Sequence, residues 1–461
     1  MRFRQQRLSF ILMILALVAG RECPADTHYV SLSGTNNSPF TSWADAATNI
    51  IWAMDAATTD GDTVLVSNGV YYTTNHIYSW RNAITLRSVN GRDVTILDGA
   101  NAGDSRCVYF TSASSALDGF TVTNYHTVGL DGVVRVPTYI RNCRFERNFN
   151  TLRGTLLANS GAVITNCIFK NNVMNSIGGA IYINPCNGLT LLGCWFEGNT
   201  GNYGVCAFYS CNNAVISNCT AINNDGSYYS GGFHLNGAGT NNLIVNCVVS
   251  KNISDGTYVS SGGIEVFGEA VVKNCIITEN RTFGTKGYGG GIHMEGNSGT
   301  NSRIINCLIA SNSAVKDGGG IWMTNSTVEN CTIISNQAGI SGGGLYVDGP
   351  ASSGTNNIIY FNTAPAAANF TNTAGNTGLS YSCVIPAVGG NGNITNDPVF
   401  KNFAGGDYRL RINSPCVNAG TNQPWMTGAV DLDGNVRIRY GIVDLGAYET
   451  FLRQGNIYRF H

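Results

Sequence analysis

The sequence predicts an all-β solenoid, and two observations support this prediction. A short phrase recurs nine times between residues 142 and 362: a cysteine, in most copies preceded by asparagine, is followed five residues later by a second asparagine. A pair of small residues, mostly Gly-Gly, recurs with the same period and leads into an alternating aliphatic stretch. Successive copies of the phrase lie 24 to 32 residues apart, which is typical of stacked coils built from strands.

The first part of the chain is predicted to be an export signal and a cap. Three arginines precede a short apolar run at residues 8–20, the pattern of a signal peptide, which we place at residues 1–25. Residues 26–63 are predicted to form an N-terminal cap. Within it, residues 42–59 have helical periodicity, and Ser42 is the expected N-cap. Such a helix would cover the unpaired strand edges at the end of a solenoid.

The coils are predicted to span residues 64–385. Five short β-like runs between residues 63 and 124 form the first, less regular coils, and about nine regular coils follow. Together they give about 11–12 coils. Residues 386–449 break the pattern and are predicted to form a C-terminal cap, and residues 450–461 form a tail.

The repeated phrase marks two columns of residues that we expect to stack inside the solenoid. Free cysteine behaves as a small buried hydrophobe. Asparagine tolerates turn corners, and its amide can satisfy buried polar groups from coil to coil. We therefore interpret the following residues as a structural ladder of reduced thiols and amides: Cys143, Cys167, Cys194, Cys219, Cys247, Cys275, Cys307 and Cys331, with Asn148, Asn172, Asn199, Asn224, Asn252, Asn280, Asn312 and Asn336. A ninth copy has Asn357 in the cysteine position and Asn362 in the second.

Two further cysteines lie outside this ladder. Cys186 and Cys211 each precede a ladder cysteine by eight residues, so they are expected to be stacked neighbours. Strands lie about 4.8 Å apart, within the Cα separation that a disulfide tolerates. A disulfide between them and a pair of free thiols both remain open.

Composition limits the partners. Charged residues make up 12% of the chain and the net charge is −1, so a broad basic surface for nucleic acid is not expected. After the signal no apolar run approaches the length of a membrane span. The mature protein is therefore predicted to be secreted or attached to the cell surface, without a transmembrane segment, and monomeric.

The coils resemble the right-handed parallel β-helix family, the pectin-lyase-like superfold, with repeats similar to those of polymorphic outer-membrane proteins. The C-terminal region resembles a choice-of-anchor Q type domain. That likeness rests on the stretches Asp397-Pro398-Val399-Phe400, Tyr408-Arg409-Leu410, Ser414-Pro415-Cys416-Val417-Asn418-Ala419-Gly420, Asp431-Leu432-Asp433-Gly434-Asn435 and Asp444-Leu445-Gly446-Ala447-Tyr448-Glu449. The resemblance implies a right-handed parallel β-helix solenoid. It leaves the function open, because this superfold hosts lyases, hydrolases, adhesins and structural proteins.

The Gly-Gly strands are expected to present two outward columns of side chains on one exposed face. The first column is Tyr182, Ala207, His234, Glu265, His293, Trp322 and Tyr346, and the second is Asn184, Tyr209, Asn236, Phe267, Glu295, Thr324 and Asp348. Aromatic planes cover sugar rings, and acids and amides bond hydroxyls. Tyr182, Trp322, Tyr346 and Asp348 are therefore the predicted carbohydrate-binding residues, with a polysaccharide or cell-surface glycan as the partner.

Catalytic residues remain open on this face. Glu265 and Glu295 lie on adjacent coils at a spacing compatible with glycosidase acid/base work, and His234 and His293 are further candidates. His234, Glu265 and His293 are also of the residue types that hold zinc. No calcium-holding aspartate cluster appears in the coils, so no cofactor is predicted. Calcium stays an alternative at Asp431-x-Asp433-x-Asn435, which lacks the distal glutamate of a calcium loop.

Three functions follow as hypotheses. The first is a non-catalytic secreted or cell-surface protein that binds carbohydrate or acts as an adhesin. The second is a polysaccharide lyase or glycoside hydrolase on the same fold. The third is a structural spacer. The sequence favours the first, because no catalytic signature emerges.

Overall fold

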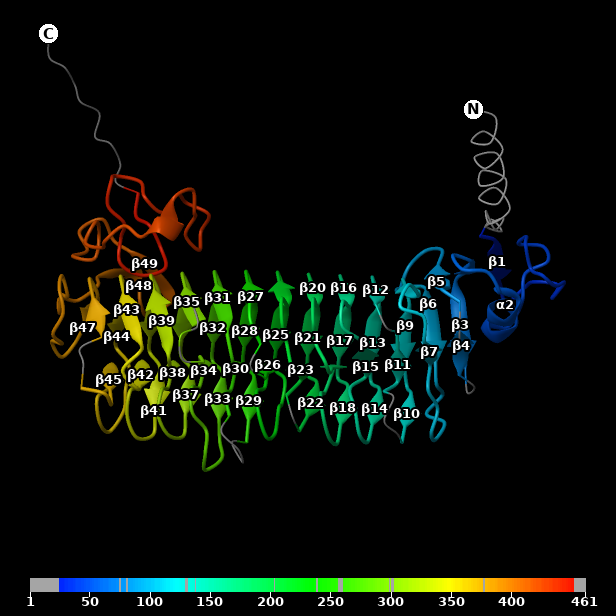
Figure 1. The fold of residues 1–461 in the computed structure, drawn as a ribbon, viewed down its shortest axis with the longest axis horizontal. Helices are drawn as coiled ribbons and strands as arrows, with labels where there is room; N and C mark the ends of the chain where they lie inside the picture. The colour runs from blue at the N-terminus through cyan, green and yellow to red at the C-terminus, as the bar shows by residue number, and fades with distance from the viewer. Residues whose placement is uncertain are drawn as a thin grey trace, which may run out of the picture.

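A computed structural model describes residues 25–451 except 74–75, 80–81, 129–131, 137, 203, 238, 256–259, 298, 300–301 and 376–377. The chain forms a long rod of stacked coils, with its N- and C-terminal parts at opposite ends (Figure 1). The predicted all-β parallel solenoid of about 11–12 coils is confirmed, because three long parallel sheets contain 14, 13 and 12 strands. The predicted signal peptide and the tail beyond residue 451 lie outside the described residues.

Sheets A and B carry the strands on either side of the cysteine corner. Sheet A contains β1 (Thr27–Val30), β2 (Thr63–Val66), β5 (Thr85–Ser88), β8 (Ala116–Asp118), β12 (Tyr139–Arg141), β16 (Val163–Thr165), β20 (Thr190–Leu192), β24 (Val215–Ser217), β27 (Asn242–Val245), β31 (Ala270–Lys273), β35 (Ser302–Ile305), β39 (Ser326–Glu329), β43 (Ser353–Thr355) and β46 (Leu379–Ser380). Sheet B contains β3 (Gly69–Tyr72), β6 (Thr95–Asp98), β9 (Thr121–Thr123), β13 (Arg144–Glu146), β17 (Ile168–Lys170), β21 (Trp195–Glu197), β25 (Thr220–Ile222), β28 (Val248–Ser250), β32 (Ile276–Thr278), β36 (Leu308–Ala310), β40 (Thr332–Ile334), β44 (Ile358–Tyr360) and β47 (Cys383–Val384).

Sheet C carries the Gly-Gly strands, and two small sheets line a lobe between sheets B and C. Sheet C contains β4 (Ile77–Ser79), β7 (Val108–Phe110), β11 (Val134–Arg135), β15 (Leu156–Ala158), β19 (Ile181–Ile183), β23 (Cys206–Tyr209), β26 (Phe233–Asn236), β30 (Ile264–Phe267), β34 (Ile292–Glu295), β38 (Ile321–Thr324), β42 (Leu345–Asp348) and β45 (Phe370–Asn372). The lobe contains β10 (His126–Thr127), β14 (Phe149–Asn150), β18 (Val173–Met174), β22 (Thr200–Gly201), β29 (Ile253–Ser254), β33 (Arg281–Thr282), β37 (Ser313–Ala314) and β41 (Gln337–Ala338).

The asparagine column forms a continuous buried chain of amides. In each coil the side-chain N–H of asparagine donates to a carbonyl of the preceding coil and to the next asparagine. For Asn280 these bonds reach Val249 O at 2.8 Å and Asn312 Oδ1 at 3.0 Å. Its own Oδ1 accepts from the backbone and side-chain N–H groups of Asn252 at 3.0 Å each. The column therefore satisfies its own buried polar groups and ties neighbouring coils together.

The eight ladder cysteines are buried free thiols. Each Sγ lies near carbonyl oxygens of sheet A; for Cys275 these are Lys273 O at 3.2 Å and Ile244 O at 3.7 Å. The asparagine before most of these cysteines turns the corner with a positive φ, such as 55° at Asn142. Inside the coils the rings of Phe145, Phe169 and Phe196 stack, with centroids 4.8 and 5.0 Å apart.

The possible disulfide between Cys186 and Cys211 is not formed. Both residues are buried free thiols in stacked coils. In-register parallel stacking keeps equivalent Cβ atoms about 4.8 Å apart, beyond the distance of about 3.5–4.5 Å that a disulfide needs.

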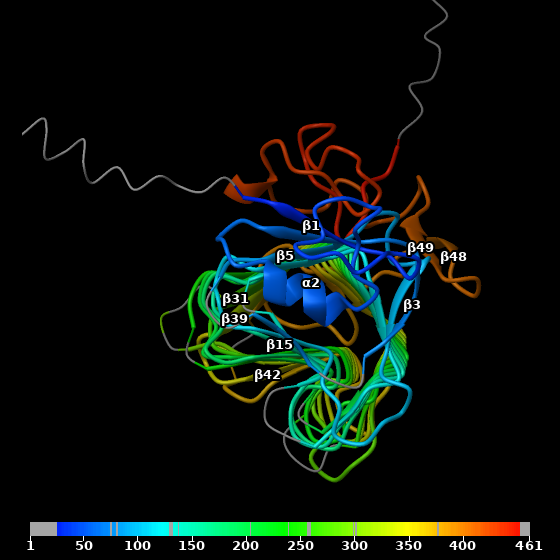
Figure 2. The same cartoon turned by 90° about the vertical axis from the view of Figure 1, so that its right-hand side faces the viewer.

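The N-terminal helix is shorter than predicted. The helix α2 spans Ile50–Ala56, and its N-cap is Asn49, which accepts from Ile51 N at 2.8 Å. Ser42 instead bonds Asp45 within a turn. The residues before Asn49 are unavailable to the helix because Ala47 pairs with β1 through Tyr29 O and Ser31 N. Figure 2 shows α2 lying across the open end of the coils, the place predicted for a cap.

The C-terminal region packs mainly against the side of the rod. It contains the hairpin of β48 (Phe400–Asn402) and β49 (Asp407–Leu410) and the short helix η1 (Pro424–Met426). Phe400, Leu410 and Leu445 bury the outer side chains of sheet B, such as Leu308 and Ile358. Figure 1 shows this region beside the last coils. We call residues 398–450 the side module. No helix among the described residues is long and apolar enough to cross a membrane.

Candidate functional site

Strand register aligns the first outward column of sheet C. Tyr182 pairs with Ala207, Ala207 with His234, His234 with Glu265, and the pairing continues through His293 and Trp322 to Tyr346. In the second column, Phe267 pairs with Glu295, Glu295 with Thr324, and Thr324 with Asp348. The candidate residues therefore lie together on one face of adjacent coils.

The expectation that this column is exposed is wrong for its centre. His234, Glu265 and His293 are fully buried, and Tyr182 is 6% exposed. Neighbouring rings contact both histidines. Tyr209 and Phe267 from the second column and Tyr229 from the preceding turn contact His234, and Trp322 contacts His293 at a centroid distance of 4.6 Å. Trp322 and Tyr346 are half-buried, and Asp348 is exposed.

The buried polar residues form a chain across three coils. His234 Nδ1 lies 2.7 Å from Glu265 Oε2, and His293 Nδ1 lies 3.5 Å from Glu265 Oε1. On the far side, His293 Nε2 lies 3.2 Å from Oε1 of Glu295, whose side chain is 40% exposed. Glu265 therefore faces two imidazoles, and the chain ends at a carboxylate that solvent reaches.

Burial and hydrogen bonding shift the pKa values of Glu265 and His293 in opposite directions. Burial disfavours the charge of Glu265, but hydrogen bonds from His234 and His293 outweigh it and hold the pKa of Glu265 below its ordinary value. Burial also disfavours the charged form of His293, yet the bonds to Glu265 and Glu295 hold its pKa above the ordinary value. The arrangement is a buried ion pair within a hydrogen-bonded chain.

The pH dependence of stability tests this pairing. The raised pKa of His293 contributes stability that is fully present below about pH 6.5 and is lost as pH rises through its folded value. The lowered pKa of Glu265 contributes stability above about pH 4.3 that is lost on acidification. The difference in unfolding free energy between the parent and Glu265→Gln should be largest between these values and shrink as the pH rises through the folded pKa of His293, as measured by denaturant titration. A difference that is constant with pH would contradict the pairing.

A row of rings runs along seven successive strands of sheet C, from β19 to β42. We call the seven residues Tyr182, Tyr209, His234, Phe267, His293, Trp322 and Tyr346 the ring row. Each ring contacts the next, with centroid distances of 5.8, 5.5, 6.2, 5.4, 4.6 and 6.3 Å in that order. Six coil steps of about 4.8 Å make the row roughly 29 Å long. Trp322 and Tyr346 are nearly parallel, with an interplanar angle of 12°.

Acids gather at one end of the ring row. Glu295 follows His293 by two residues on β34, and Asp348 follows Tyr346 by two on β42, so each lies on the same face as its ring. Burial raises the pKa of the Tyr346 hydroxyl, and the charges of Asp317 and Asp348 raise it further. The Nζ of Lys316 lies 5.2 Å from the ring centroid of Tyr288 and 3.2 Å from its hydroxyl.

The sequence reasoning missed the two turn tyrosines. Tyr229 lies over His234, and Tyr288 lies 6.1 Å from Trp322. Both stand two residues before the first glycine of a Gly-Gly pair. That shared position is the signal that would have found them.

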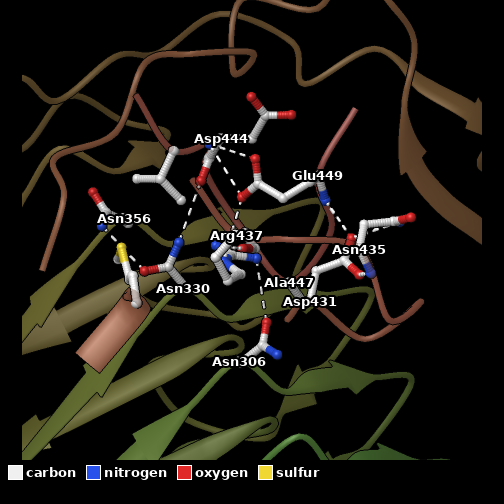
Figure 3. Close-up of polar contacts among 12 residues, drawn as sticks. Asn306, Asn330, Asn356, Asp431, Asn435, Arg437, Asp444, Ala447 and Glu449 are labelled. Carbon is white, nitrogen blue, oxygen red and sulfur yellow. Dashed lines mark hydrogen bonds and ion pairs between the residues drawn. The ribbon is translucent and has the colours of Figure 1, made fainter. Parts of the chain in front are cut away.

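A second polar cluster lies under the side module (Figure 3). Arg437 is fully buried, and its Nε lies 3.3 Å from Glu449 Oε1. Its Nη1 donates to Asn306 Oδ1 at 3.3 Å and its Nη2 to Gly446 O at 2.9 Å. Asn330 donates to Asp444 O. Asn356 donates to Thr421 O and accepts from Thr421 N. The cluster joins the side module to the asparagine corners of the rod, so its role is attachment.

The Asp431-x-Asp433-x-Asn435 motif, for which calcium was an alternative, forms a turn in the side module. The carboxylate of Asp431 accepts N–H bonds from Asp433, Asn435 and Glu449, an arrangement that closes a turn. Within the described ranges, no group of three or more His, Cys, Asp or Glu side chains is arranged to hold a metal ion. This includes His234, Glu265 and His293, which bond one another directly.

Comparisons with known proteins address the fold. The sequence matches the family described as "Right handed beta helix region" over residues 64–221 and 128–298. The solved structure of pectate lyase Pel9A aligns with a TM-score of 0.38 at 16% identity, covering 93% of this chain and 98% of that one. The alginate lyase AlyGC aligns with a TM-score of 0.44 at 12% identity, covering 73% and 52%. The catalytic domain of a GH87 alpha-1,3-glucanase in complex with nigerose aligns with a TM-score of 0.36 at 14% identity, covering 78% and 70%.

A search of curated proteins gives no match. The likeness to the solved structures, at these identities, concerns the fold. The two family matches together span residues 64–298, about half of the chain. The protein therefore belongs to the right-handed β-helix family.

Proposed function

We propose that the chain binds a polysaccharide along the ring row without converting it. The observation that carries this proposal is the unbroken row of seven rings over roughly 29 Å, parallel to the long axis of the rod. Four of these rings, Tyr209, Phe267, Trp322 and Tyr346, are partly exposed and can meet a ligand, and the buried rings of His234 and His293 link them. A linear polymer offers repeated apolar ring faces and hydroxyls, which suit a row of aromatic planes with carboxylates beside it. Trp322 and Tyr346 are the half-buried anchors, and Asp348 supplies an exposed acceptor.

Burial weakens the enzymatic alternative on this face. A general acid or base must reach the proton that it transfers. Glu265, His234 and His293 are fully buried behind other side chains, which leaves Glu295 as the only exposed member of the four catalytic candidates. Incubation with a polysaccharide panel separates the hypotheses. Retention without products supports binding, unsaturated products indicate a lyase, new reducing ends indicate a hydrolase, and no interaction leaves a structural spacer.

Trp322→Ala should weaken glycan binding by about 1–3 kcal/mol, because it removes one of two parallel anchor rings. The measurement is a binding isotherm with a polysaccharide that the parent retains. Trp195→Ala is the control, since Trp195 is an exposed tryptophan on sheet B, away from the ring row. Equal affinity of the parent and Trp322→Ala would place the binding surface elsewhere.

We also propose an exported, monomeric protein. The basic and apolar N-terminal pattern supports export. The resemblance of the side module to a choice-of-anchor Q type domain supports a location at the cell surface. Fractionation of the producing cells, followed by detection of the protein in the cytoplasm alone, would contradict this location.

A further inference from the structure

We propose that the ring row prefers glycans that carry amino groups to glycans that carry carboxylates. This inference rests on the polysaccharide binding proposed above and names the chemical class of the ligand. The ring row forms the binding surface, and the charges beside it decide which polymer it accepts.

The charges at the acidic end of the row exclude a polyanion. Glu295 and Asp348 stand on the same strands as His293 and Tyr346, and Asp317 lies in the turn before Trp322. Asp317 and Asp348 interact unfavourably, and burial together with this repulsion outweighs Lys316 to raise the pKa of Asp317. A uronate polymer laid over Trp322 and Tyr346 would bring further carboxylates next to these groups. Like charges in such contact disfavour binding.

The face already holds an ammonium group of its own. Lys316 Nζ donates to the hydroxyl of Tyr288 at 3.2 Å, and the ring of Tyr288 in turn contacts Trp322. Its neighbour in the chain is Asp317, whose charge interacts favourably with it. An aromatic ring with a carboxylate nearby is a favourable environment for an ammonium group. An amino sugar stacked on Trp322 would meet the same two kinds of group.

The opposite end of the row differs in charge. There the guanidinium of Arg153 lies 5.4 Å from the ring centroid of Tyr182, four coil steps from His293. A carboxylate-bearing glycan would find its favourable contact at this end, away from the parallel anchor rings. The two ends therefore predict opposite preferences, and a binding experiment separates them.

The test compares three oligosaccharides, which are cationic, neutral and anionic. A glucosamine oligomer and its fully N-acetylated counterpart have the same linkage and length, and a galacturonate oligomer supplies the anionic arm. At low salt and pH 6 the glucosamine oligomer should bind the parent about threefold to tenfold more tightly than the acetylated one. The galacturonate oligomer should bind most weakly. The preference should shrink as salt is added, because exposed charges are screened.

Variants test whether the acids cause the preference for the amine. The double variant Asp317→Asn/Asp348→Asn should lose most of the preference for the amine, measured as the ratio of its affinities for the glucosamine oligomer and the acetylated oligomer. Glu279→Gln is the control, since Glu279 is an exposed acid at another corner of the rod. Equal binding of amine and acetylated oligomers, or tighter binding of galacturonate, overturns the inference while the proposed function stands. If no oligomer and no polysaccharide binds, the proposed function fails and the inference falls with it.

Discussion

Replacing Asn280 by alanine is expected to lower the free energy of unfolding by about 3–5 kcal/mol. The substitution removes two donated bonds, to Val249 O and Asn312 Oδ1, and the acceptor of two N–H groups of Asn252. All these groups are buried, so each loses a partner that water cannot replace. The effect should exceed that of an ordinary core truncation because it interrupts a chain of bonds that runs through successive coils.

Denaturant titration measures this effect, and Asn202→Ala is its control. The side chain of Asn202 bonds Asn175 O at a partly exposed site, so its loss should cost less than about 1 kcal/mol. If the two alanine variants unfold at the same denaturant concentration, the amide column does not stabilise the rod.

Replacing Arg437 by methionine should destabilise the attachment of the side module by about 3–5 kcal/mol. Methionine fills much of the same volume but leaves the carboxylates of Glu449 and Asp444 buried without their cation. Burial raises the pKa of Glu449 and the charge of Arg437 opposes this shift, so the carboxylate depends on Arg437 to stay ionised where it lies. The rod has its own ladders and should stay folded.

Hydrogen exchange resolved along the chain measures the two parts separately. Amides of residues 398–450 should lose protection in Arg437→Met, while those of the asparagine column keep theirs. Adding Glu449→Gln to this variant should restore part of the protection, because one unpaired carboxylate is removed. Arg409→Met serves as the control, since Arg409 is half exposed and its ion pairs lie at the surface. Unchanged protection in Arg437→Met would mean that apolar contacts alone hold the module.

The regular part of the fold was predictable because each coil repeats the same pattern of inward and corner residues. A cysteine and an asparagine at fixed spacing mark two corners, and the alternation after them assigns Phe169 and Ile277 to the interior. Neighbouring coils constrain one another, so nine copies determine strand pairing along the whole rod. The same periodicity gave the outward column from Tyr182 to Tyr346 in the correct register.

The predictions that failed depended on contacts that the repeat period of the coils does not determine. The rings that cover His234 are those of Tyr209, Phe267 and Tyr229, whose positions depend on strand twist and turn length. The helix predicted near residue 50 was too long, because helical periodicity cannot show that Ala47 pairs with β1. The side module's contacts with Asn306 and Asn356 join residues more than sixty positions apart in sequence, without a repeat to mark them.

The most direct test of glycan binding at the ring row is a crystal structure of the protein with a bound oligosaccharide that it retains in solution. The proposal predicts sugar rings stacked on Trp322 and Tyr346, with hydroxyl or amino groups facing Asp348 and Glu295. The oligosaccharide should run parallel to the long axis of the rod. Density for the oligosaccharide on sheet A, on sheet B or on the side module, with the ring row uncovered, would contradict it.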